Sequence, residues 1–224
     1  NFPIEEINKI VSNQEQYQKT IDEFAQTTVF EDHLHTYKHL IKMKYGVQPT
    51  SKFKAISGSC IVHGSVIDAV KYDVAPREIS PDMTKHQRNG CMCRYHYYAD
   101  DSEFAPYIFH QTQETPVSII SPREVVALRF VVDLSTQNCQ KFKVYTHSCE
   151  PNVQFCQKVV RSFLLDYNLY EQIDEKSFKV SNFFHLDPAG NIPSAIFNLN
   201  LDNQMNYLIE VKEHVEGIGR KKEP

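Results

Sequence analysis

The sequence contains no run of 18 or more apolar residues, the length that a membrane-spanning helix needs. It has no leader in which a charged segment precedes an apolar one, as a secreted precursor would have. A net charge of −4 offers no excess of positive charge for nucleic acid. These absences predict a cytoplasmic protein that does not bind nucleic acid, with any membrane attachment supplied by segments outside this chain.

The cysteines are few and scattered. Six of them occur in 224 residues, a length that can build a core without disulfides, so we expect reduced thiols. The pair Cys91 and Cys93 lacks the second pair at ligand spacing that a zinc site requires. The sequence therefore predicts no metal and no cofactor.

What is present is enough for one domain. An apolar fraction of 41% supports a continuous core. Apolar residues at heptad-like spacing predict one N-terminal helix within residues 1–28. Residues 29–192 are mostly short β-rich segments, with short helices expected at 65–74 and 81–87. Six successive strands between residues 91 and 186 leave no room for crossover helices, which predicts an antiparallel sheet and the α+β class.

The last element is expected to be a long helix over residues 193–217. Pro193 suits the first turn, and Gly217 is a natural terminator. One helical stripe carries the apolar residues Phe197, Leu201, Met205, Leu208, Val211 and Val215. Two interpretations fit this stripe: it packs on the sheet as core, or it roofs a cavity.

Two local motifs and the order of elements resemble the START family of lipid-binding domains. The stretch "HLDPAGNIPSAIFN" at 185–198 is similar to the family signature, in which an acidic or amide residue, a Gly turn and an Ile-Pro pair lead into the C-terminal helix. Ser121-Pro122-Arg123-Glu124, followed by "VVALR", is similar to the family's Pro-Arg-Asp segment entering a central strand. The chain departs from the family most at residues 65–98 and contains no tryptophan.

The resemblance implies a single domain with the helix-grip fold, a curved antiparallel sheet wrapped around the long C-terminal helix. It also implies a tunnel between the two that holds one lipid molecule. The loop at 115–120 would act with the helix as a lid. Its Ile119 and Ile120 would contact lipid or a membrane surface, or else pack into the core.

The resemblance also implies which side chains line the tunnel. Arg129 and His110 would form its polar end. Its apolar wall would consist of Val125, Ala127, Phe109, Phe197, Leu201, Met205 and Leu208. Because a buried arginine needs an acceptor, Arg129 requires Glu114, Asp82 or a ligand phosphate or carboxylate beside it. Arg77 and Asp82 form either a polar pair at the cavity or a surface ion pair.

Three functions remain open at this point. The first is non-enzymatic binding and transfer of one sterol or phospholipid by a monomer that touches membranes transiently. The second is an enzyme of the cyclase or hydrolase type that acts on a hydrophobic substrate, with His110 as general acid or base. The third is a regulatory module whose tunnel is filled by its own side chains.

Overall fold

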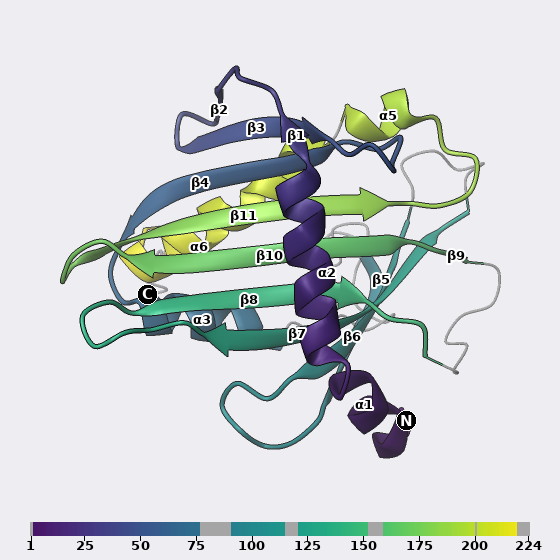
Figure 1. Cartoon of the computed structure of the whole chain (residues 1–224), viewed down its shortest axis with the longest axis horizontal. Helices are drawn as coiled ribbons and strands as arrows, with labels where there is room; N and C mark the ends of the chain where they lie inside the picture. Colours follow the sequence, from purple (N-terminus) through teal and green to yellow (C-terminus); the bar gives the residue numbers. More distant parts are fainter. Residues whose placement is uncertain (1, 77–90, 115–120, 152–158, 200, 219–224) are drawn as a thin grey trace, which may run out of the picture.

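The computed structural model describes residues 2–76, 91–114, 121–151, 159–199 and 201–218. These residues form one large antiparallel sheet with helices on both of its faces (Figure 1). The α+β class, with a large antiparallel sheet packed against a C-terminal helix, is therefore confirmed.

The described part of the sheet has eleven strands in the order β1-β3-β4-β11-β10-β8-β7-β6-β5, with β2 beside β3 and β9 beside β7. Most neighbouring pairs are antiparallel, whereas β9 pairs with β7 in parallel. The bounds are β1 Val29–Phe30, β2 His35–Tyr37, β3 Ile41–Val47, β4 Ala55–His63, β5 Cys91–Tyr98, β6 Tyr107–Gln113, β7 Arg123–Asp133, β8 Lys141–Ser148, β9 Val160–Arg161, β10 Phe163–Gln172 and β11 Ser177–Asp187.

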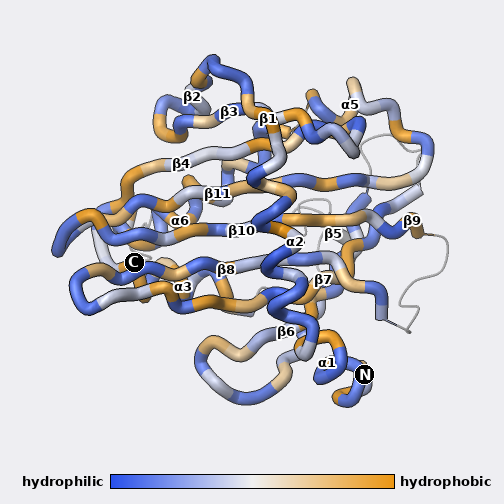
Figure 2. Tube along the Cα trace, in the orientation of Figure 1, coloured by the Kyte–Doolittle hydropathy of each residue, from blue (hydrophilic) through white to orange (hydrophobic). Residues whose placement is uncertain are grey.

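The two faces of the sheet carry separate cores. On the face that we call inner, α3 (Val66–Val74) and α6 (Asn206–Glu216) pack against the strands. On the outer face, α1 (Ile4–Val11) and α2 (Gln14–Thr27) cover a second core. Figure 1 shows α2 crossing in front of the strands, with α3 and α6 behind them. Figure 2 shows that α2 is hydrophilic along most of its length, and Ile21 is its fully buried residue.

The N-terminal segment forms two helices rather than the single helix expected. The break falls at Ser12 and Asn13, whose side chains donate hydrogen bonds to the Lys9 carbonyl at 2.7 and 3.0 Å. Short polar side chains that bond to the backbone in this way compete with helix continuation. The break lets α1 contact β6 while α2 crosses β8 and β10.

The predicted helix over 193–217 is also interrupted. It consists of α5 (Ser194–Asn198), a 3-10 helix η1 (Leu201–Met205) and α6. The sequence at the interruption is rich in Asn and Asp, which favour local side-chain to backbone bonds over regular helix. The expected end is correct, because Gly217 adopts a left-handed conformation there.

Helix α3 forms where the sequence predicts it. The Ser65 hydroxyl accepts a hydrogen bond from the Asp68 amide at 3.2 Å and so caps the first turn. The predicted helix at 81–87 lies outside the described residues. No helix in the described ranges is both long and apolar enough to cross a bilayer.

Candidate functional site

Strand β7 supplies the centre of the inner face. Its side chains alternate between the two faces, as those of any strand do. Leu128 and Phe130 pack in the outer core. Val125, Ala127 and Arg129 therefore point to the inner face, which agrees with the expectation for this strand.

Arg129 is the hub of a polar cluster within the otherwise apolar inner core. Its Nη2 donates a hydrogen bond to Asp73 of α3, and its Nη1 donates to Thr146 Oγ1 of β8 at 3.0 Å. The same Nη1 lies 4.0 Å from Oδ2 of Asp166 in β10. With the residues bonded to these, the Arg129 cluster comprises Arg129, Asp73, Thr146, Asp166, Asn168, Tyr170, Asn182 and Tyr207.

Asp73 is fully buried and fully hydrogen-bonded. Its Oδ1 pairs with Arg129, and its Oδ2 accepts from Asn168 Nδ2 at 3.0 Å and from the Tyr170 hydroxyl at 2.9 Å. The Tyr170 hydroxyl also lies 2.9 Å from that of Tyr207 in α6. This last bond joins the cluster on the sheet to the C-terminal helix.

Asp166 is farther from the guanidinium than Asp73 is. Its carboxylate accepts hydrogen bonds from Asn182 Nδ2, at 2.7 Å to Oδ1, and from the Thr146 side chain, while Oδ2 lies at the longer distance from Arg129 given above. Burial raises the pKa of Asp166 to about 6; Arg129 opposes this rise and Asp73 adds to it. Burial acts to lower the pKa of Arg129, but Asp73 beside it holds that pKa well above its usual value. Arg129 is therefore a permanent cation, and Asp166 is a weaker acid than an ordinary aspartate.

The cluster is not completely shielded. Arg129 and Asp166 lie deep in the molecule, yet 14% and 11% of their side-chain surfaces are accessible. Two further polar atoms, Arg129 Nε and Asn182 Oδ1, are buried without a hydrogen-bond partner. Accessible surface and unpaired polar atoms at this depth are the features that a small polar ligand group would satisfy.

The acceptor of Arg129 differs from those expected. Neither Glu114 nor a ligand is needed, because Asp73 and Asp166 flank the guanidinium, and Asp82 lies outside the described residues. The reason is topological, since α3 packs across β8 and β10 and so brings Asp73 to the middle of the inner face.

Both acids carried a signal in the sequence. Asp73 continues the stripe of Val66, Ala69 and Val70 at helical spacing, so an acid stands on the buried side of α3. Asp166 belongs to a series of polar residues at every second position of β10, which places them on one face. An acid on an apolar stripe is a recognisable mark of a buried pair.

His110 does not share the polar end with Arg129. It is the register partner of Val126, and its side chain therefore projects from the outer face. Its Nε2 lies 2.8 Å from Glu124 Oε1, and Arg161 Nη2 lies 2.8 Å from the other oxygen of Glu124. We call His110, Glu124 and Arg161 the Glu124 cluster. The expectation was wrong because counting along the chain fixed the position of His110 but not the face of β6 from which its side chain projects.

Charge in the Glu124 cluster is balanced. Burial alone would raise the pKa of Glu124, but hydrogen bonds from His110 and Arg161 outweigh it, so this pKa lies below its usual value. Arg161 stands in β9, whose parallel pairing with β7 brings it beside Glu124. The arrangement fastens β9 to the sheet and leaves no half-satisfied carboxylate.

The C-terminal stripe packs on the strands as the helical period predicts. Leu201, Met205 and Leu208 are buried in the inner core, and Phe197 packs at its edge. At Gly58 a methyl group would overlap the Met205 sulfur, so helix and sheet are in close contact there. The inner face is thus filled by side chains near β3 and β4.

The remaining predicted wall residues occupy the other end of the inner face. Phe109 is the register partner of Ala127, which puts both on the same side of the sheet as Arg129. Phe109 and Val125 are half-buried. Ile119 and Ile120, and also Arg77, fall outside the described residues.

The two sequence motifs meet in space. The Arg123 Nε donates a hydrogen bond to the Pro188 carbonyl at 2.7 Å, and its Nη2 donates to the Ala189 carbonyl at 3.3 Å. Ala189 and Gly190 both have positive φ, 54° and 65°, and so turn the chain out of β11. The arginine of one motif therefore holds the turn of the other, and this junction sets the direction in which the C-terminal segment starts.

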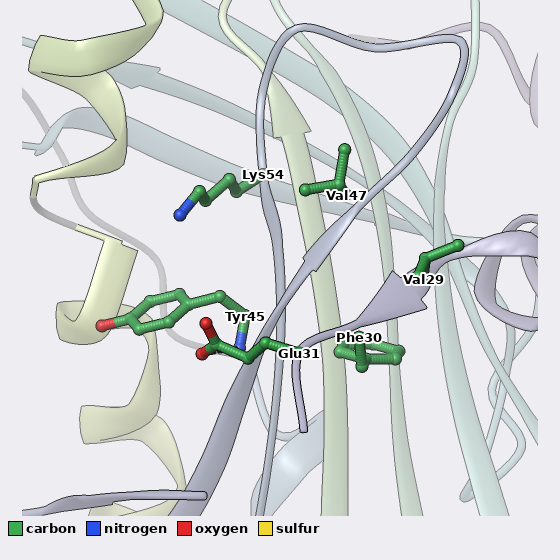
Figure 3. A pocket seen from close by; sticks show the side chains of 6 residues that line it. All are labelled: Val29, Phe30, Glu31, Tyr45, Val47 and Lys54. Atoms are coloured by element: carbon green, nitrogen blue, oxygen red, sulfur yellow. Dashed lines mark hydrogen bonds between the residues drawn. The ribbon is translucent and has the colours of Figure 1, made fainter. Parts of the chain in front are cut away.

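A separate pocket of about 240 Å³ lies at the opposite edge of the sheet, beside β1 and β3 (Figure 3). Its lining consists of Val29, Phe30, Glu31, Tyr45, Val47 and Lys54. The Tyr45 ring points toward the C-terminal segment, where its hydroxyl bonds to Asp202. Glu31 accepts from the Tyr45 amide at 3.1 Å and bonds to His35 at 2.7 Å. The polar groups of this pocket thus already have partners.

Metal-ligating side chains do not converge in the described ranges. No group of three or more His, Cys, Asp or Glu residues there has an arrangement that could hold an ion. Cys60, Cys139 and Cys149 have free thiols, and burial raises the pKa of Cys60 to about 11 and of Cys149 to about 12. The thiols of Cys60 and Cys149 are therefore poor nucleophiles at neutral pH.

Solved structures share this arrangement over most of the chain. Human StAR-related lipid transfer protein 5 superposes with a TM-score of 0.64 at 14% identity, covering 91% of this chain and 98% of its own. A STAR-related lipid transfer protein from Xanthomonas axonopodis gives 0.63 at 15% identity, with 82% and 98% coverage. Human STARD10 gives 0.61 at 12%, with 93% and 82% coverage.

Neither a family model nor a curated sequence matches the chain. At sequence identities of 12 to 15%, these superpositions establish the arrangement of the backbone but not which residues form a site. On the evidence of the sheet, the C-terminal helix and these superpositions, the chain has the START, or helix-grip, fold.

Proposed function

We propose that this protein binds one lipid molecule between the inner face of its sheet and the C-terminal segment, and carries it between membranes without chemical change. The observation that supports this most directly is the Arg129 cluster, a set of buried polar groups within an apolar core in which Arg129 and Asp166 stay partly accessible. A lipid has the matching form, since its hydrocarbon gains from leaving water while one polar end needs hydrogen bonds.

The lipid would lie toward β6, β7, β8 and β10. Met205 fills the inner face near Gly58, and the half-buried Phe109 and Val125 and the partly accessible Arg129 lie away from that contact. The residues proposed to line the site are Arg129, Ala127, Val125 and Phe109 on the sheet, and Phe197, Leu201, Met205 and Leu208 on the C-terminal segment. Lid contacts by Ile119 and Ile120 are part of the proposal.

Two other functions have less support. The enzyme interpretation relied on His110, whose side chain points to the outer face and is engaged by Glu124. The filled-module interpretation fits the contact between Met205 and Gly58 but leaves the unpaired Arg129 Nε and Asn182 Oδ1 without a role.

The test is lipid binding and vesicle-to-vesicle transfer by the purified chain and by Val125→Trp. The added ring would occupy the inner face, where lost contact with a few methylene groups, at about 0.8 kcal/mol each, weakens binding by about tenfold or more. Ile61→Trp is the matched control, because Ile61 is exposed on the outer side of β4. Unchanged transfer by Val125→Trp, or no lipid found by native mass spectrometry of the purified chain, would refute the proposal.

A further inference from the structure

Helix α2 lies on a row of three side chains that includes two buried histidines. His147 of β8 and His185 of β11 are both register partners of Leu165 in β10, and cross-strand partners project from the same face. Leu165 belongs to the outer core, so the whole row faces α2. The two histidines are 6% and 2% exposed, respectively. Two ionisable rings are therefore enclosed between the sheet and the N-terminal helix.

Each histidine contacts an aromatic ring of α2. Tyr17 stacks on His147 with the ring centroids 4.4 Å apart, and Phe24 packs on His185 at 4.7 Å. Seven residues of helix rise about 10.5 Å, close to the distance of about 9.6 Å across two strand spacings. The two contacts therefore fit a helix that crosses the strands, as α2 does in Figure 1.

Both imidazoles suit the neutral form. The Nδ1 of His147 lies 2.5 Å from the Ser148 carbonyl, whereas its Nε2 has no hydrogen-bond partner in the described part of the chain. His185 bonds to the backbone of Lys54, and its Nδ1 is likewise without a partner among the described residues. A neutral ring carries a single N–H, but a protonated ring carries two. Protonation in place would therefore bury a charged N–H that lacks an acceptor.

The neighbours of both histidines are mostly apolar. Their register partners on the flanking strands are Leu128, Leu165 and Ala55. Burial lowers the pKa of both rings, although the bond to Ser148 opposes this for His147, and Asp187 and the Lys54 backbone oppose it for His185. The other ionisable groups near the row, on α2 and β8, are either uncharged at neutral pH or paired with one another: Tyr17, Cys149, Asp22 and Lys143.

The remaining contacts of α2 with the sheet are local. Ile21 is its fully buried side chain, and Asp22 pairs with Lys143 at 2.6 Å. Gln48 donates a hydrogen bond to the Phe24 carbonyl at 3.0 Å. The inner core lies on the other face of the sheet and consists of residues from other elements. Release of α2 is therefore a local opening, which costs less free energy than unfolding of the domain.

We propose that His147 and His185 form a pH-sensitive switch: in mildly acidic solution both rings take up a proton and α2 leaves the sheet, while the sheet and its inner face stay folded. Hydrated rings bind protons at the ordinary histidine pKa of about 6.5, above that of the buried rings. Their contribution to docking is therefore present above about pH 6.5 and is lost as pH falls. Because two protons are involved, the released fraction can rise by up to about a hundredfold per pH unit.

The test is hydrogen–deuterium exchange of the unchanged chain at pH 7.5, 6.0 and 5.0, measured by mass spectrometry. Results are expressed as protection factors, so that the intrinsic pH dependence of exchange cancels. We expect the protection of peptides within residues 14–27 to fall at least about tenfold between pH 7.5 and 5.0. Peptides from β10 and α6 should stay protected. Unchanged protection of α2, or equal loss of protection in β10 and α6, would overturn the inference.

The double variant His147→Phe/His185→Phe keeps a ring beneath each aromatic side chain of α2 but cannot bind a proton. Its α2 protection should not depend on pH over this range. His33→Phe/His63→Phe is the matched control, because both histidines are exposed, and it should keep the loss in acid. The pair of Asp22 and Lys143 is present in both variants, so an acid effect that survives in the first would belong to that pair and refute the switch. The pH series on the unchanged chain stands whether or not the variants fold.

Discussion

The two faces of the sheet each bury an acid, and the surroundings shift the pKa values of these two acids in opposite directions. On the outer face Glu124 has two basic partners, and its pKa lies below the usual value despite burial. On the inner face Asp166 shares one arginine with a second acid, and burial raises its pKa to about 6. The Glu124 cluster joins β9 to β7 with its charges balanced. In the Arg129 cluster, two acids share one arginine. The inner cluster, with two acids to one arginine, is the one that the proposed function places at the polar end of the lipid site.

Replacing the arginine on each face should give the largest difference between the two faces in the loss of unfolding free energy. Arg129→Met leaves Asp73 and Asp166 buried without a cation, and breaking a buried pair in this way costs about 3–5 kcal/mol of unfolding free energy. Arg161→Met should cost only about 1 kcal/mol, because Arg161 is partly exposed and Glu124 keeps His110. Urea denaturation of both variants measures the difference. Equal losses would remove the distinction between the faces.

Neutralising the acid on each face should change stability in opposite directions. The pKa of Asp166 is about 6 in the folded chain against the usual 3.8, a difference of about 2, and one pKa unit corresponds to about 1.4 kcal/mol. A raised acid pKa means that the folded state binds the extra proton, so the stability due to Asp166 is present below pH 4 and is lost as pH rises through 6. Asp166→Asn should therefore stabilise the chain at pH 7.5 by up to about 3 kcal/mol.

Glu124→Gln should destabilise the chain at the same pH. Its folded pKa is lowered, so its contribution is present above the unfolded pKa and is lost as pH falls through the folded one. Thermal melts of both variants at pH 5 and pH 7.5 provide the measurement. Stabilisation by Glu124→Gln at pH 7.5, or destabilisation by Asp166→Asn that is independent of pH, would contradict the assignment of the two environments.

A smaller effect should test the filled part of the inner face, where Met205 meets Gly58. Gly58→Ala places a methyl group against the Met205 sulfur, and such overpacking costs about 1–3 kcal/mol. In the background of Met205→Ala the same change should cost less than about 1 kcal/mol, because the added methyl then fills vacated volume. The double-mutant cycle, measured by urea denaturation, reports the contact directly. Additive losses would mean that helix and sheet do not meet there.

Much of the fold could be predicted because it follows from local patterns. Strand alternation in β7 placed Arg129 on the inner face, and the helical period placed Leu201, Met205 and Leu208 against the sheet. The breaks at Asn13 and after Asn198 were missed, since each depends on polar side chains within an otherwise periodic segment. The pattern of apolar residues predicts which face of a helix or strand is buried more reliably than it predicts whether the element is continuous.

The site was harder to predict because its members come from elements distant in the chain. Asp73 reaches Arg129 only through the packing of α3 across β8 and β10, which no spacing in the sequence records. The position of His110 could be counted, but its face depends on the register between β6 and β7. The resemblance between motifs predicted the fold correctly, whereas the charge balance of the cluster required the three-dimensional arrangement.

Tyr207 gives the C-terminal helix a contact whose main consequence is kinetic. Any motion that lifts α6 from the strands must break the bond between the Tyr170 and Tyr207 hydroxyls and admit water to the pair formed by Asp73 and Arg129. Tyr207 also bonds to Asp73, and Lys212 and Glu216 of α6 bond to the backbone of β4. Under the proposed function, the residence time of a bound lipid would depend on how readily all of these contacts open together.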